Sequence, residues 1–132
     1  MKYFSLIVLV FAVTISSCNK KNADDWVGVY NGQSGQTIQR VIVEKVDNST
    51  LRIQLQTPFL GSFATYATIN NAKVTDNSSI TVSEDGLIYG STDTYKFSGS
   101  GNLNGNALTV SGNAVNKTNP SDVKNYYFTG SK

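Results

Sequence analysis

The sequence predicts an all-β fold, either a single antiparallel β-barrel of about eight strands or a two-sheet β-sandwich. From Trp26 onward, apolar and polar residues alternate in short stretches, which is the period of a half-buried strand. Turn-forming residues separate these stretches every 8–12 residues or so. No window of this region has the spacing of an amphipathic helix. The length of 132 residues allows one domain.

The clearest pair of strands lies near the start of this region. Residues 40–46 form a β-branched run, and residues 51–56 alternate apolar and polar side chains. Residues 47–49, Asp-Asn-Ser, supply the turn of a hairpin between them. The inward face of the second strand is expected to contain Leu51, Ile53 and Leu55.

The middle of the chain is expected to contain three shorter strands, at residues 62–69, 79–83 and 87–89. Asn70-Asn71 is expected to end the first of them. Asp85-Gly86 is a hairpin signal between the other two.

Residues 94–98, 107–115 and 123–129 complete the set of strands, with a second hairpin turn at Asn104-Gly105. In the last strand Tyr126 and Phe128 share one face, which we expect to point inward, and Tyr127 takes the outer face. We therefore expect Tyr126 and Phe128 to belong to the core rather than to a stacking platform.

The N-terminus has the pattern of a secretory signal, which is expected to be helical. Lys2 is followed by an apolar run at residues 3–13 and then by small residues. The run is shorter than the roughly 20 residues that a bilayer span needs. Residues 15–18, Ile-Ser-Ser-Cys, resemble the lipobox of bacterial lipoproteins. The resemblance implies cleavage between Ser17 and Cys18 and acylation of Cys18; the alternative is an ordinary signal-peptidase site that leaves a free thiol.

Together, the lipobox and the strand pattern predict a lipoprotein signal peptide (1–17), a lipid anchor and tether (18–25) and an antiparallel β-domain (26–132). Two or three acyl chains hold a protein on a membrane durably. Asn19, rather than Asp, follows the cysteine, which favours the outer membrane over inner-membrane retention. The opening Trp26-x-Gly28-x-Tyr30, the hairpins and the Tyr-rich last strand resemble small lipocalin-like (calycin) lipoproteins of Bacteroidota, which implies a barrel.

The composition excludes several classes of function. The chain has no His and one Cys, so it cannot build a Ser-His-Asp or Cys-His catalytic set or a His/Cys zinc site. A net charge of +2 provides no electrostatic footprint for nucleic acid. Glu84-Asp85 is an adjacent acid pair, but it flanks a predicted turn, where both groups should be solvated. We expect no enzyme, no metal and no cofactor.

Four aromatic residues are the candidates for contact with a ligand: Trp26, Phe63, Tyr66 and Tyr95. An eight-stranded barrel can hold one small ligand or be filled by its own side chains, and filling is the simpler expectation here. A lone Trp on the first strand more often plugs the end of a barrel than lines a pocket.

The sequence therefore favours a membrane-anchored, non-enzymatic binding module of the cell envelope, expected to be a monomer. One alternative is a carrier of a small apolar ligand. Another is an inhibitor of a hydrolase from a host or a competitor, which would present a rigid loop to the enzyme. Residues 56–61 and 116–122 are the longest candidate loops for that role.

Overall fold

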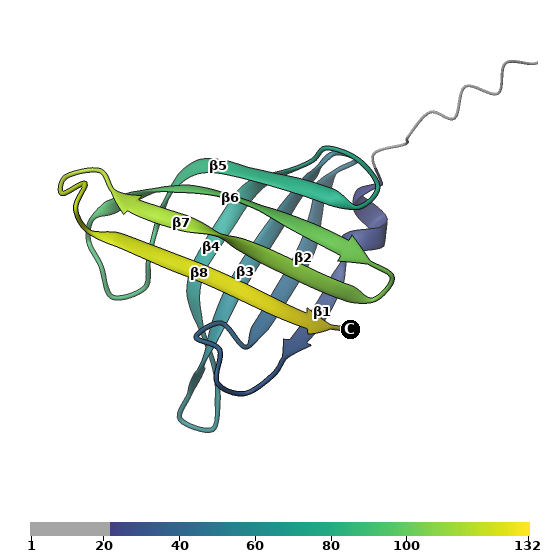
Figure 1. The fold of residues 1–132 in the computed structure, drawn as a ribbon, viewed down its shortest axis with the longest axis horizontal. Coiled ribbons are helices and arrows are strands. Elements are labelled where there is room, and N and C mark those ends of the chain that lie inside the picture. Colours follow the sequence, from purple (N-terminus) through teal and green to yellow (C-terminus); the bar gives the residue numbers. More distant parts are fainter. Residues whose placement is uncertain (1–21) are drawn as a thin grey trace, which may run out of the picture.

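The computed structural model describes residues 22–132. Eight strands form a closed antiparallel barrel in which each strand pairs with the next and the last pairs with the first (Figure 1). The predicted barrel is confirmed, and the sandwich is not formed. In chain order the elements are η1 (Ala23–Trp26), β1 (Gly28–Gly32), β2 (Arg40–Asp47), β3 (Thr50–Phe59), β4 (Ser62–Val74), β5 (Ser79–Leu87), β6 (Thr94–Asn104), β7 (Ala107–Asn116) and β8 (Val123–Ser131).

The strand alternation places the core inside the barrel, as predicted. Leu51, Ile53 and Leu55 of β3 have no exposed area, and Arg52 between them faces solvent. Tyr126 and Phe128 of β8 are 4% and 1% exposed, whereas Tyr127 is 54% exposed. The largest fully buried side chains are Trp26, Tyr30, Phe97 and Phe128.

Two glycines, one on β6 and one on β7, let the side chain of Tyr126 pack directly against the backbone of these strands. Gly99 and Gly112 lie opposite each other in the register. A Cβ at Gly112 would lie 2.1 Å from the carbonyl oxygen of Ser98 and 2.4 Å from the hydroxyl of Tyr126. That hydroxyl donates a 3.1 Å hydrogen bond to the Ser98 carbonyl. Burial raises the pKa of Tyr126 to about 12, so the hydroxyl keeps its proton at neutral pH.

Two predicted breaks are not breaks in the structure. Asn70-Asn71 lies inside β4, where the register shifts between the pairs Leu51↔Ala72 and Ile53↔Ile69. The extra residue is absorbed as a bulge because both asparagines point to solvent. Asp85-Gly86 is not a hairpin turn either. Both residues lie in β5 and pair with β6, so β5 ends at Leu87 and no separate strand forms at residues 87–89.

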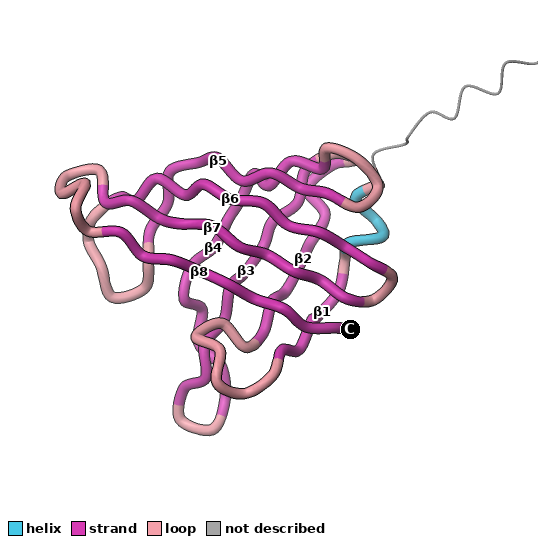
Figure 2. Tube along the Cα trace, viewed as in Figure 1, coloured by secondary structure: helices cyan, strands magenta, loops and turns pink. Residues whose placement is uncertain are grey.

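The first element of the described residues is a short 3-10 helix, η1, rather than a strand (Figure 2). Asn22 caps it by accepting a hydrogen bond from the backbone N–H of Asp24, at 3.1 Å. Ala23 and Trp26 are buried, so the packed body begins at Ala23, inside the stretch expected to be tether. The Tyr30 hydroxyl donates a 2.8 Å hydrogen bond to the Trp26 carbonyl. Trp26 therefore plugs one end of the barrel from η1, not from β1.

Candidate functional site

The two ends of the barrel differ. Helix η1 covers one end, which we call the closed end. The other end, the rim, is formed by the loop of residues 33–39, the β3–β4 turn, the loop of residues 88–93 and the loop of residues 117–122 (Figure 1). The loops of the β5–β6 and β7–β8 hairpins bring distant parts of the chain together at the rim. The rim is the first candidate region for a site, because ligands of small barrels enter at the mouth.

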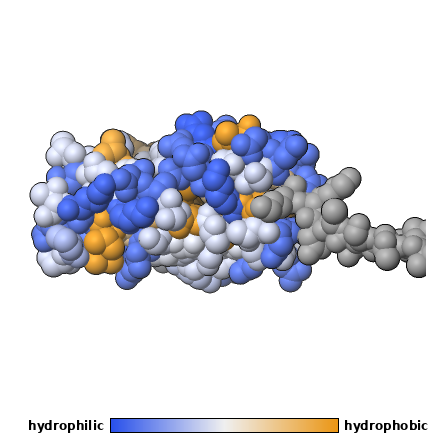
Figure 3. Space-filling view, turned by 90° about the horizontal axis from the view of Figure 1, so that it is seen from above, coloured by the Kyte–Doolittle hydropathy of each residue, from blue (hydrophilic) through white to orange (hydrophobic). Residues whose placement is uncertain are grey.

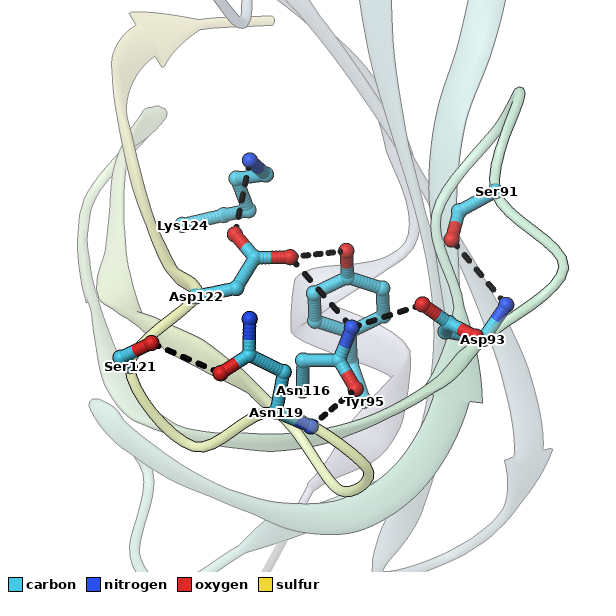
Figure 4. Close-up of polar contacts among 8 residues, drawn as sticks. All are labelled: Ser91, Asp93, Tyr95, Asn116, Asn119, Ser121, Asp122 and Lys124. Atoms are coloured by element: carbon cyan, nitrogen blue, oxygen red, sulfur yellow. Dashed lines mark hydrogen bonds and ion pairs between the residues drawn. The ribbon is translucent and has the colours of Figure 1, made fainter.

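A hydrogen-bonded network of Asp93, Tyr95, Asn116 and Asp122, the rim network, lies across this mouth (Figure 4). The Asn116 side-chain amide donates to Asp93 Oδ2 at 2.8 Å and to Asp122 Oδ2 at 3.4 Å. The Tyr95 hydroxyl donates to the same Asp122 oxygen at 2.7 Å. Tyr95 and Asn116 are each 3% exposed, so these contacts are shielded from water.

The rim network holds two loops rather than a reactive group. Asn116 Oδ1 also accepts from the backbone N–H groups of Thr118 and Asn119, at 2.8 and 3.1 Å, which folds the loop back on itself. The Lys124 ammonium lies 2.8 Å from Asp122. Hydrogen bonds from Lys124 and then from Tyr95 lower the pKa of Asp122, so the carboxylate is charged at neutral pH and serves as an acceptor.

The four aromatic candidates do not share one cavity. Tyr66 is half-buried near Tyr95 and Asp122 at the rim, and burial raises its pKa. Trp26 lies at the closed end. Phe63 is 36% exposed on the outside of the barrel, with the Arg40 guanidinium 4.6 Å above its ring. The candidate Phe63 therefore does not line the barrel interior; it precedes a bulge that shifts the register of β4 between Thr65 and Ala67.

The barrel axis is filled. Side chains from every part of the axis have no exposed area, so no space that could admit a water molecule touches them: Trp26, Val41, Leu51, Ile53, Phe97, Leu108 and Val110 are examples. Hollows of about 290 to 500 Å³ lie on the surface and open to solvent.

Among residues 22–132 no three acidic, His or Cys side chains gather to hold a metal ion. In the same residues no helix is long and apolar enough to cross a bilayer.

One hairpin projects beyond the rest of the rim (Figure 1). Strand β2 begins at Arg40, opposite Gln56, but β3 and β4 continue through three more pairs to Phe59↔Ser62. We call residues 57–64 the arm. None of these eight residues is charged. Phe59 is 55% exposed and Leu60 is 89% exposed. On the face drawn in Figure 3, apolar surface is scattered in small patches among hydrophilic side chains.

The tip of the arm is strained. Leu60 has φ of +48° and is the sole non-glycine residue in the described part of the chain with a positive φ. Gly61 follows with φ of +76°. Gly or Asn normally occupies such a turn, because the Cβ of other residues clashes with the backbone there, whereas Gly has no Cβ and the short polar side chain of Asn hydrogen-bonds locally. A large apolar side chain at an exposed, strained position marks the tip as a candidate functional element.

Sequence reasoning missed the arm because it placed residues 56–61 in a loop. The structure corrects this: Gln56 to Phe59 belong to β3, and the turn consists of Leu60 and Gly61. The available signal was the uncharged run of residues 57–64 around an X-Gly dipeptide. The other predicted loop, residues 116–122, does follow a strand end and is held by Asn116.

No family model, curated protein or solved structure matches this chain significantly. The lipobox and its cleavage position, Ser17 and Cys18, fall outside the described residues. The resemblance to calycin lipoproteins stays a prediction beyond the barrel itself.

Proposed function

We propose that the protein is a non-enzymatic binding module of the cell envelope, anchored to the outer membrane through acylated Cys18, and that the arm is its recognition element. The observation that supports this proposal most directly is the cluster of exposed Phe59, Leu60 and Phe63 on a projecting hairpin. Exposed aromatic and aliphatic residues that leave water on binding contribute most of the affinity of protein interfaces.

The position of the N-terminus supports an outward-facing arm. Residue 22 lies next to η1 at the closed end, whereas the arm projects from the rim. From Cys18 to Asn22 the chain spans five residues, which reach about 17 Å when extended. An acylated Cys18 would therefore keep the closed end near the bilayer and leave the arm free to meet a protein partner.

The alternatives fare differently against these observations. A carrier needs room for its ligand, and the filled axis offers none unless buried side chains such as Phe97 move. A hydrolase inhibitor needs a projecting rigid segment, and the arm would serve as that segment. The inhibitor is thus a particular version of the proposed binding module, in which the partner is an enzyme.

Site-specific photo-crosslinking in intact cells tests the proposal. A photoreactive phenylalanine at position 60 should give a discrete crosslinked protein, whereas the same residue at Asn104, exposed on the opposite end, should not. Equal crosslinking from both positions, or none from position 60, would refute the arm as the recognition element.

A second experiment tests the anchor. Cys18→Ala should abolish fatty-acid labelling and membrane fractionation; unchanged fractionation would refute the anchor.

A further inference from the structure

The barrel wall has a gap between β4 and β5. The two strands pair at Lys73↔Thr81 and Val74↔Ile80 and then separate. They meet again at the single bridge Ala67↔Ile88, next to which the backbone N–H of Tyr89 donates a 2.8 Å hydrogen bond to the carbonyl of Tyr66. Between these points the strands share no register pair, although each is paired on its other side with β3 or β6.

Backbone groups along this gap need other partners. One has been supplied by a side chain: the N–H of Asn71, at the bulge of β4, donates to Glu84 Oε1 at 2.7 Å. Further along, a surface hollow of about 390 Å³ opens over the gap. This volume lies in the range of about 300–1,000 Å³ that is usual for small-ligand sites.

The lining of this hollow combines two kinds of surface, and none of its lining residues is charged. Thr65, Thr68 and Asn70 on β4 provide hydroxyl and amide groups. Tyr66, Leu87 and Tyr89 provide aromatic and apolar surface, and Tyr89 is 78% exposed and Leu87 is 59% exposed. A neutral ligand with an apolar face and a polar edge fits such a lining.

We propose that this hollow, the seam site, binds a neutral oligosaccharide. A sugar ring has an apolar face that can stack on a tyrosine and a circumference of hydroxyls that exchange hydrogen bonds with side-chain amides and hydroxyls. An extended peptide fits the gap less well. Added strands need an open sheet edge, and this gap is closed at both ends by Lys73↔Thr81 and Ala67↔Ile88. The proposal does not depend on the arm or on the anchor.

Amide shift perturbation on the full-length purified chain in detergent tests the seam site. The probes are maltotetraose, cellotetraose and mannotetraose. Each is added to about 10 mM, a concentration that would nearly saturate a weak site with a dissociation constant of about 1 mM. At least one should shift amides of residues 65–70 and 86–89 specifically. Tyr89→Ala should weaken that binding about tenfold, the upper end of what one aromatic contact contributes.

A matched control and a second site variant keep the test decisive. Tyr127→Ala removes a tyrosine of similar exposure on β8, 54% against 78%, and should leave binding unchanged. Asn70→Ala, at an exposed position of β4, should weaken binding without unfolding the protein. The proposal is overturned if no tetrasaccharide shifts seam amides, if the shifts fall elsewhere, or if a Thr/Val-rich neutral peptide binds the hollow when sugars do not.

Discussion

Replacing Leu60 by Asn should stabilise the protein while removing the tip of the arm. A residue with Cβ in the left-handed region costs about 1–2 kcal/mol, and Asn tolerates that region far better than Leu does. Leu60 is 89% exposed, so the substitution gives up little burial, about 0.3 kcal/mol at most. The net expectation is a gain of about 1 kcal/mol in the free energy of unfolding.

Urea unfolding measured by circular dichroism checks this value. The midpoint should rise with the slope m unchanged, and Tm should rise by about 4 °C. Gly61→Ala, at φ of +76°, is the matched control and should destabilise by about 1 kcal/mol. If Leu60→Asn instead destabilised the protein by 1 kcal/mol or more, the Leu60 side chain would contribute to stability through packing in the folded state. That result would refute the inference that Leu60 is retained for binding at a cost in stability.

Three further predictions concern the barrel. Gly112→Ala should cost about 3 kcal/mol or prevent folding, because the new Cβ would overlap the Ser98 carbonyl and the Tyr126 hydroxyl; thermal unfolding measures the loss, and a neutral result would contradict the close approach. Trp26→Ala should cost about 3–5 kcal/mol in urea unfolding, but Trp26→Phe much less, because the buried indole N–H has no hydrogen-bond partner among residues 22–132 to lose; equal costs would contradict this. The lowered pKa of Asp122 means that its contribution to stability is present above the unfolded pKa of about 3.9 and is lost as pH falls through the folded value. The urea midpoint of Asp122→Asn should therefore fall less steeply than that of the unchanged protein as the pH is lowered below about 4, and parallel profiles would contradict the assignment.

Local pattern was sufficient for the strands and their inward faces. The alternation at residues 51–56 and 126–128 predicted which side chains are buried, because side chains of neighbouring strand residues point to opposite faces. The same local reasoning failed at Asn70-Asn71 and Asp85-Gly86. Both dipeptides favour turns in isolation, but pairing with β3 and β6 keeps the chain extended through them.

The candidate sites were the least predictable part of the molecule. In the rim network Tyr95 contacts Asp122, which lies 27 positions further along the chain. A contact over that separation cannot be predicted from local sequence spacing. The seam site depends on where β4 and β5 part, which is a property of the register of both strands. The sequence does indicate Tyr66 as a candidate ligand contact. Its neighbours in the hollow, Leu87 and Tyr89, are not predicted, because the local pattern places them in a separate strand.

The order of residues alone determined an all-β domain of short alternating strands, a composition without His, and an apolar N-terminal stretch followed by Ile-Ser-Ser-Cys. These are properties of neighbours in the chain, where side-chain periodicity and turn chemistry act. Tertiary structure decided that the sheet closes on itself, that Trp26 plugs one end, that the arm outruns β2 at the other, and that β4 and β5 part. Each of these depends on how strands of different lengths and registers fit around one filled interior, a constraint that no short stretch of sequence contains.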